Sequence, residues 1–267
     1  MRLKAISIGV LLAAMPTSIA QSLPMDGASS LAGAALIGGV QDHFSSVRSR
    51  AEQGDAEAQF HLGLMYSLGD GVAQSRTESV RWMRLSAAQG YAGAQYNLGA
   101  YYELGVGVSQ NSLEAVRWYR LAAAQGDAEA QSRLGSMHLH GIGVTQNYVE
   151  AVRWYRLAAA QGDAFAQDDL GGMYSRGHGV AQNVAEAVRL FRLAADQGYD
   201  NAQNNLGVMY FHGRGVPQNF VEAYKWFALS AAQGSARALP NLDLVRGRMT
   251  PAQIAEGQRL AEAWRPR

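Results

Sequence analysis

Residues 127–162 read DAEAQSRLGSMHLHGIGVTQNYVEAVRWYRLAAAQG, and this 36-residue pattern occurs five times in succession without insertion or deletion. The five copies span residues 55–90, 91–126, 127–162, 163–198 and 199–234. A pattern that returns about every 20–50 residues is typical of a helical solenoid or a related repeat architecture. The residues that return at fixed positions are Gln59, Gln95, Gln131, Gln167 and Gln203; Leu62, Leu98, Leu134, Leu170 and Leu206; Gly71, Gly107, Gly143, Gly179 and Gly215; and Glu78, Glu114, Glu150, Glu186 and Glu222.

The first part of each copy predicts one helix, which we name helix A. In the first copy it covers about residues 55–68, where the apolar residues Ala58, Leu62 and Met65 follow the spacing of one helix face. Asp55 suits the N-cap, because its carboxylate can accept hydrogen bonds from the first free backbone amides. Gly69 and Gly71 then favour a stop, because glycine adopts left-handed conformations cheaply.

The second part of each copy predicts another helix, which we name helix B. It begins after Ser75 in the first copy and after an Asn in the others, with a Glu three residues later, as in a capping box. A Gly follows the recurring Leu of helix A, and we expect the Trp of helix B to fill the space beside it. That Trp is Trp82, Trp118, Trp154 or Trp226, and Leu190 replaces it in the fourth copy.

A single pair of such helices cannot bury its own apolar face, so the pairs must stack. The sequence therefore predicts an all-α fold, a solenoid of helix-turn-helix repeats of 36 residues. Residues 42–54 align with helix B and form an N-terminal half repeat, and residues 235–267 supply C-terminal capping helices. Ser235 opens a sixth helix A in this interpretation, and Thr250-Pro251 opens the last helix, which carries Trp264.

The repeat unit closely resembles the Sel-one-like repeat (SLR) family, a cousin of the tetratricopeptide repeats. The third copy carries the resemblance in Ala130-Gln131, Leu134-Gly135, Gly141-Ile142-Gly143-Val144 and Glu150-Ala151, and it extends over about residues 42–240. His138 departs from the usual Tyr. The resemblance implies a right-handed α/α superhelical solenoid with helix A on its concave side. It also implies a scaffold or adaptor role toward other proteins or peptide segments, among them envelope or secretion components.

The first 20 residues predict a signal peptide. Arg2 and Lys4 precede an apolar run over residues 5–15, and Ser18-Ile19-Ala20 supplies small residues before a cleavage site. The run is shorter than the roughly 20 residues that span a bilayer, which disfavours an uncleaved anchor. We expect cleavage after Ala20, a flexible lead-in over residues 21–41, and a periplasmic or secreted protein without stable membrane insertion.

Composition excludes several kinds of chemistry. The 267-residue chain has no Cys, so disulfides, thiol nucleophiles and Cys-bound metals are ruled out. Its formal net charge of +1 gives no reason to expect a nucleic-acid partner. Each helix B carries a stripe of Arg, and a Glu three residues before the first Arg predicts an ion-paired outer face. An anionic glycan partner stays open as the alternative.

No catalytic, cofactor or metal site is predicted. The Gly-x-Gly loops lack the strand and third glycine of a dinucleotide fingerprint, so they indicate turns. His138, His140 and His178 have no carboxylate pattern that completes a metal site, and we expect them on the surface or partly packed. Asp168 and Asp169 diverge by 100° on helix A and predict a solvated face rather than an acid pair. The sequence thus favours a protein that is not an enzyme.

Helix A offers the candidate partner-binding surface. Positions matching residues 57, 60, 64 and 67, with 68 at their flank, differ from copy to copy, so packing does not fix them. Exposed aromatic rings there would be binding anchors. Peptidoglycan or polysaccharide binding is the alternative function, and a weak β-lactam-hydrolase-like enzyme, implied only by distant relatives, is the second. The candidate residues are Phe60, Tyr96, Ser132, Asp168, Asn204, His140, Arg176, Phe211 and His212.

Overall fold

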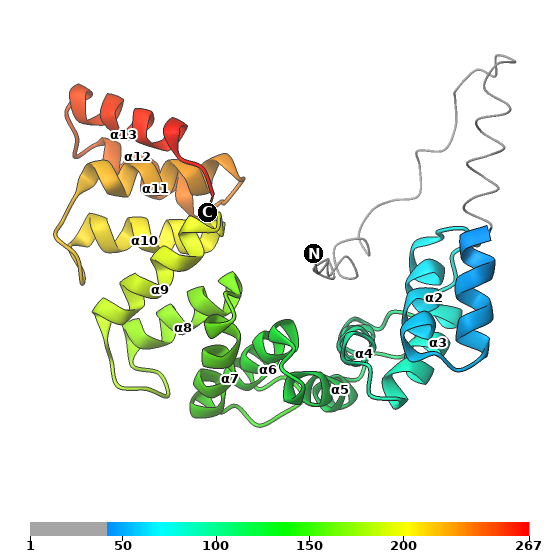
Figure 1. Cartoon of the computed structure of the whole chain (residues 1–267). Helices are drawn as coiled ribbons and strands as arrows, with labels where there is room; N and C mark the ends of the chain where they lie inside the picture. Colours follow the sequence, from blue (N-terminus) through cyan, green and yellow to red (C-terminus); the bar gives the residue numbers. More distant parts are fainter. Residues whose placement is uncertain (1–41, 267) are drawn as a thin grey trace, which may run out of the picture. The chain divides into compact units, whose positions relative to one another are not determined.

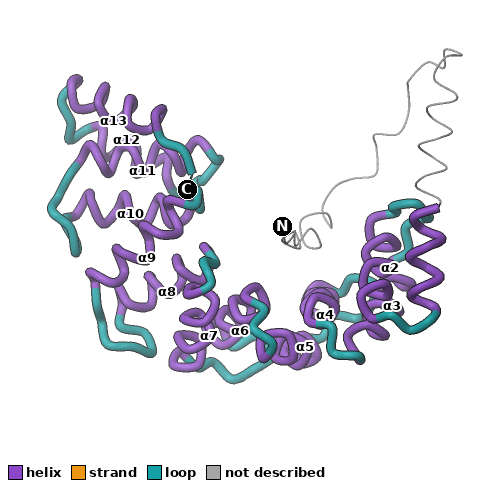
Figure 2. Tube along the Cα trace, in the orientation of Figure 1, coloured by secondary structure: helices purple, strands orange, loops and turns teal. Residues whose placement is uncertain are grey.

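The computed structural model describes residues 42–266, so the predicted signal peptide and lead-in lie outside the described residues. Within that range every regular element is a helix, and no strand occurs (Figure 2). The chain forms two compact units, divided after Asp127, and each is described by itself (Figure 1). The predicted all-α, helical-repeat fold class is confirmed.

Unit 1 begins with a helix over residues 42–52, which precedes the first full repeat. Its further helices are α2 (Ala56–Leu68), α3 (Arg76–Ala88), α4 (Ala92–Leu104) and α5 (Ser112–Ala124). Unit 2 contains α6 (Ala128–His140), α7 (Tyr148–Ala160), α8 (Ala164–Arg176), α9 (Val184–Asp196), α10 (Asp200–His212), α11 (Phe220–Ala232), α12 (Ala238–Arg246) and α13 (Pro251–Ala263). Even-numbered helices α2 to α10 are helix A, and the odd-numbered helices α3 to α11 are helix B.

The helix ends follow the predicted caps, with one correction. Asn219 Oδ1 accepts hydrogen bonds from the amides of Val221 and Glu222, both at 3.0 Å. Glu222 does not reach back to the Asn219 amide, because that amide donates to the carbonyl of Tyr210 at the end of α10. The reciprocal half of the predicted capping box is therefore absent from this helix, and Glu222 instead accepts from Lys225 at 3.2 Å.

The close approach of helix A to helix B depends on a glycine, as predicted, but its neighbour is not the Trp. A Cβ atom added at Gly207 would lie 2.6 Å from the ring of Phe227, the residue after Trp226. The Trp that was expected to fill this space is rotated by about 100°, one residue along the helix. The residues that fill it are Met83, Tyr119, Tyr155, Phe191 and Phe227.

The recurring glutamines connect the repeats. In the fifth repeat, Gln203 Oε1 on α10 accepts from Gln233 Nε2 at the end of α11, at 2.8 Å. Gln203 Nε2 donates to the carbonyl of Ala195, which belongs to α9 of the preceding repeat. The same glutamine pair recurs in all five repeats, at 2.8–2.9 Å. Each pair therefore joins helix A to helix B through a partly buried hydrogen bond.

A glycine and a glutamine stabilise the loop between helix A and helix B of each repeat. Gly179 has a φ of 69°, and a Cβ atom there would clash with the backbone of Tyr148 at the start of α7. Gln182 Nε2 donates to the carbonyl of Ser175 at 2.8 Å, which satisfies one of the free carbonyls at the end of α8. The Gly-x-Gly loop is thus a turn that packs against the preceding repeat, as predicted.

The C-terminal helices differ from a sixth repeat. Helix α12 begins at Ala238 rather than after Ser235, and it has nine residues. Helix α13 packs against α11 and begins where the sequence predicts, and Thr250 and Gln253 form a capping box at its start. The rings of Trp264 and Trp226 meet edge to face at 6.4 Å, which closes the core of the last repeat.

Candidate partner-binding site

The structure buries one of the helix A positions that were predicted to face solvent. In unit 2 position 60 is buried in each helix A, whereas the positions matching residues 57, 61 and 67 are half-buried or exposed, and position 68 is exposed. The prediction that Ser132, Asp168 and Asn204 face solvent is wrong. Their exposed fractions are only 5%, 8% and 8%.

Buried side chains at position 60 join neighbouring helices. Asp168 Oδ1 accepts from Asn205 Nδ2 at 2.8 Å, which connects α8 to α10. Asn204 Oδ1 accepts from Asn241 Nδ2 at 2.8 Å, which connects α10 to α12. Ser132 Oγ donates to the N-cap carboxylate of Asp163 at 3.0 Å. Copy-to-copy variation at this position thus reflects pairing with the next repeat.

Unit 1 holds the two aromatic candidates of the same series. Phe60 is half-buried, because its ring packs on Tyr91 at 5.0 Å and near Gly93. Tyr96 is buried, and its ring lies 5.7 Å from that of Tyr119. The expectation of an exposed ring is therefore wrong for Tyr96.

The remaining candidates lie nearer to solvent. His140, Arg176 and His212, all at position 68, are exposed at the ends of α6, α8 and α10. Arg176 lies back over Gly172, where an added Cβ would come within 2.9 Å of its Nη2 atom. Phe211 is half-buried and packs against Phe220 at 5.5 Å.

The adjacent carboxylates of α8 diverge as predicted, but they are not solvated. Asp168 points to Asn205, whereas Asp169 accepts a 2.6 Å hydrogen bond from the hydroxyl of Tyr155 on α7. Burial raises the pKa of Asp168 to about 7, and the nearby charge of Asp169 adds to this rise. Burial also raises the pKa of Asp169. Ionising either of these two carboxyl groups of α8 in the folded protein therefore costs free energy.

Phe165 is an exposed ring that the sequence alone does not single out. Its side chain is 37% exposed at the start of α8, and its ring lies 6.3 Å from both Tyr155 and Tyr199. Phe165 stands at the position that matches residue 57, which differs from copy to copy. This variation in the sequence could therefore have pointed to it. Phe165, Asp169, Gly172 and Arg176 are spaced i, i+4, i+7 and i+11 and form one stripe of α8. Together with the equivalent residues of α6 and α10 they are called the helix A face of unit 2. Those are Glu129, Arg133, Ser136 and His140 on α6, and Asn201, Asn205, Val208 and His212 on α10.

The histidines do not gather around a common point. His178 stacks on Tyr148 with the ring centroids 5.0 Å apart, and His140 Nδ1 lies 2.9 Å from the carbonyl oxygen of Ser136. His138 is buried. Across residues 42–266, no three His, Asp or Glu side chains are placed to hold a metal ion.

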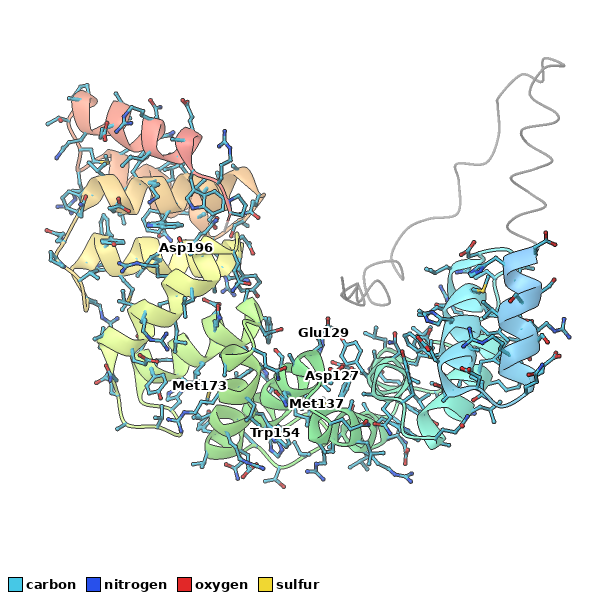
Figure 3. The ribbon with its side chains drawn as sticks, viewed as in Figure 1. Asp127, Glu129, Met137, Trp154, Met173 and Asp196 are labelled. Carbon is cyan, nitrogen blue, oxygen red and sulfur yellow. The ribbon has the colours of Figure 1, made fainter. Side chains whose placement is uncertain are left out.

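The predicted ion pairs on helix B are present. Arg81, Arg153 and Arg189 contact the Glu three residues earlier at 2.9, 3.1 and 2.7 Å. The second Arg of the stripe has a different partner: Arg156 and Arg192 donate to the hydroxyls of Tyr174 and Tyr210 in the next repeat. The stripe therefore serves largely internal contacts. Figure 3 shows the side chains of the described residues, including Met137 and Met173, which are buried in the core of unit 2.

Stacked helix pairs with a varied helix A face define a helical-repeat interaction protein. The Sel1 repeat family model matches residues 56–91, 92–127, 128–163, 164–199 and 200–235, so the chain belongs to the Sel1 repeat family. The resemblance to Sel-one-like repeats is confirmed. Members of this family are generally protein-interaction scaffolds and are typically not catalytic.

Solved structures agree with this assignment. The fold is similar to that of a Sel1 repeat protein from Oxalobacter formigenes, with 33% identity, a TM-score of 0.74, and coverage of 88% of this chain and 97% of that one. It is also similar to a protective antigen present in uropathogenic Escherichia coli strains that displays an SLR fold, with 29% identity and a TM-score of 0.60. That match covers 84% of this chain and 56% of the antigen. No curated protein matches the chain significantly. None of the described helices combines the length and apolarity that crossing a membrane requires.

Proposed function

We propose that the protein is an exported scaffold that binds a segment of another protein along the helix A face of unit 2. The observation that carries this proposal is the stripe of α8, where exposed Phe165 and Arg176 flank a glycine on one side of the helix. Neighbouring positions on α8 are fixed by packing, but these residues differ from their equivalents in the other repeats. In this scaffold, residues 42–54 form a half repeat and residues 235–267 form the C-terminal cap.

The chemistry of the face favours a polar segment with one apolar anchor. Phe165 and the half-buried Tyr199 supply aromatic surface, which is enriched where binding energy concentrates. Asp169 offers a carboxyl group and Arg176 a positive charge on the following turns of α8. A segment that places an apolar side chain on Phe165 and a carboxylate on Arg176 would satisfy both groups.

The test compares two matched sets of exposed residues in unit 2. Changing Phe165→Ala, Arg176→Ala and His212→Ala together should abolish capture of the partner, while the far-ultraviolet circular dichroism stays helical. The control changes Arg153→Ala and Leu157→Ala on the exposed side of α7, and capture should survive. Capture that survives the first set and is lost with the control would contradict the proposal. Retention on pure peptidoglycan without a protein partner would favour the glycan alternative instead.

Export rests on the N-terminal sequence alone. Arg2 and Lys4, the apolar run over residues 5–15 and the small residues up to Ala20 support cleavage of a signal peptide. An exported scaffold would meet its partner in the periplasm or outside the cell.

A further inference from the structure

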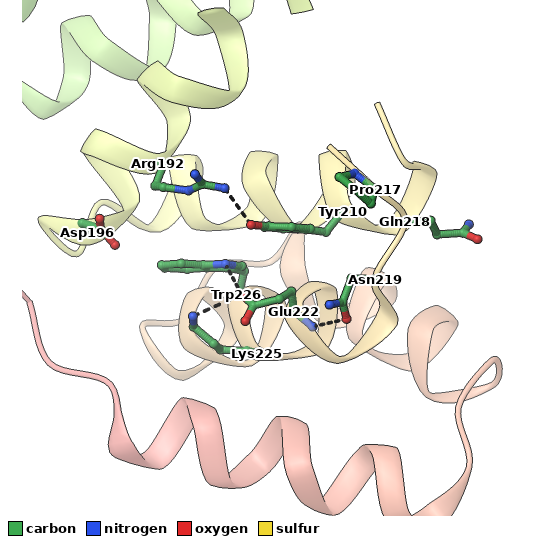
Figure 4. A pocket seen from close by; sticks show the side chains of 9 residues that line it. All are labelled: Arg192, Asp196, Tyr210, Pro217, Gln218, Asn219, Glu222, Lys225 and Trp226. Carbon is green, nitrogen blue, oxygen red and sulfur yellow. Dashed lines mark hydrogen bonds and ion pairs between the residues drawn. The ribbon is translucent and has the colours of Figure 1, made fainter. Parts of the chain in front are cut away.

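Two hollows open between successive repeats of unit 2, one repeat apart. The first, of roughly 470 Å³, lies among α7, α8 and α9, and the second, of roughly 440 Å³, lies among α9, α10 and α11 (Figure 4). Equivalent residues line both: Arg156 and Arg192, Tyr174 and Tyr210, Glu186 and Glu222. The repeat architecture thus builds one kind of hollow twice.

The second hollow contains two departures from the repeat. Asp196 occupies a position where the other four repeats have Ala88, Ala124, Ala160 and Ala232. Lys225 occupies a position where the others have Arg. Packing does not require either change, since the remaining repeats form the same helices without them. Both changes place a distinct charged group at the same hollow.

The charges in the second hollow are only partly paired. Glu222 Oε2 accepts from Lys225 Nζ at 3.2 Å and from the indole Nε1 of Trp226 at 3.1 Å, so this acid and this amine neutralise each other. Arg192 Nη2 donates to the hydroxyl of Tyr210 at 2.7 Å, and no carboxylate within residues 42–266 pairs with the guanidinium.

Asp196 stays without a hydrogen bond or ion pair among the described residues, although it lies one turn from Arg192. The same i, i+4 spacing does form a pair elsewhere, where Arg48 Nε lies 2.7 Å from Glu52. The Arg192 guanidinium instead donates to the hydroxyl of Tyr210 on α10. Figure 4 shows Arg192 and Asp196 on α9 facing the hollow, with the rings of Tyr210 and Trp226 beside it.

We propose that this hollow binds a zwitterionic small molecule, a free α-amino acid with an apolar side chain. Its ammonium group would pair with Asp196, and its carboxylate would accept from the remaining N–H groups of Arg192. Its side chain would lie against Tyr210 and Pro217. Ligand sites of this kind combine an apolar wall with a few convergent polar groups. Charge-assisted hydrogen bonds of both signs would give the site its selectivity.

The experiment titrates the mature protein with three related probes and follows the indole N–H signal of Trp226 by nuclear magnetic resonance. L-phenylalanine carries both charges, phenethylamine lacks the carboxylate and 3-phenylpropionate lacks the ammonium group. We expect a saturable shift with L-phenylalanine and at least about tenfold weaker binding of either analogue, the usual effect of losing one charged hydrogen bond.

The variant Asp196→Ala is a matched control for folding, because it restores the residue that the other repeats have. It should leave the spectrum otherwise unchanged and abolish the shift with L-phenylalanine. Absence of a saturable shift in the unaltered protein would overturn the proposal. Equal binding of phenethylamine, or undiminished binding by Asp196→Ala, would also overturn it.

Discussion

Gln233 donates a 2.8 Å hydrogen bond to Gln203, and Gln203 donates onward to the carbonyl of Ala195 in the preceding repeat. Gln203 is completely buried, so its amide has no access to water that could replace these partners. One glutamine side chain therefore joins α10 to α11 and to α9. This explains why the same two glutamines return in every copy of the repeat.

Replacing Gln203→Leu should destabilise unit 2 by about 2–3 kcal/mol, because Gln233 loses its acceptor and the carbonyl of Ala195 loses one of its donors. Urea unfolding followed by circular dichroism measures this change. Gln218→Leu is the control, since its exposed amide only caps the carbonyl of Phe211, and it should cost less than about 1 kcal/mol. Equal losses of stability for the two variants would show that burial of the Gln203–Gln233 hydrogen bond is unimportant.

Gly207→Ala should be the more damaging of two similar substitutions. The new methyl group would meet the rigid ring of Phe227 at 2.6 Å, and overpacking of this kind costs about 1–3 kcal/mol. Gly63→Ala meets only the flexible end of Met83, at 3.0 Å, and alanine also favours the helix by up to about 1 kcal/mol. Thermal unfolding should show a clear fall for Gly207→Ala and little change for Gly63→Ala. A fall of the same size in both would contradict this packing account.

The stability of unit 2 should depend on Asp168. Because its folded pKa is raised to about 7, the unfolded chain releases the proton first, and stability is lost as the pH rises from about 4 to about 7. Asp168→Asn removes the ionisable group and can still accept from Asn205. Its advantage over the unaltered protein should be near zero at pH 4 and reach a few kcal/mol, as an order of magnitude, above pH 7. Urea midpoints measured across this range test the prediction, and a constant difference would refute it.

Export with cleavage after Ala20 predicts a mature protein with a defined N-terminus. Expressed in a Gram-negative host, the chain should appear in the periplasmic or extracellular fraction with an N-terminus at Gln21, which intact-mass measurement detects. Changing Ala20→Arg should block cleavage, because the signal peptidase site needs a small residue there. A full-length chain confined to the cytoplasmic fraction would exclude the signal-peptide interpretation.

Much of the fold could be predicted because its determinants are local. The N-cap residues, the glycine stops and the Glu–Arg pairs depend on neighbours within one helical turn, so the sequence alone specifies them. Asp55 and Asn111 cap their helices, and Arg189 pairs with Glu186, as expected. The 36-residue period then made stacking of the helix pairs unavoidable.

The candidate site was harder to predict from the sequence. An error of one residue in assigning positions to a helix face turns that face by 100°. Variation between copies pointed to helix A, but it could not distinguish a solvent-facing position from one that pairs with the next repeat. Asp168 and Asn204 are such paired positions, since they accept from Asn205 and Asn241. Likewise, only the tertiary structure shows that Phe227 lies against the glycine of helix A.

The central claim is that the helix A face of unit 2 contacts a partner protein. The most direct test places a photo-crosslinking residue at position 165, on α8, and another at position 157, on the exposed side of α7. In living cells, position 165 should give one dominant protein adduct that is lost when Arg176→Ala and His212→Ala are added, and position 157 should give none. An adduct at position 157 alone, or none at position 165 in a folded and exported protein, would contradict the account.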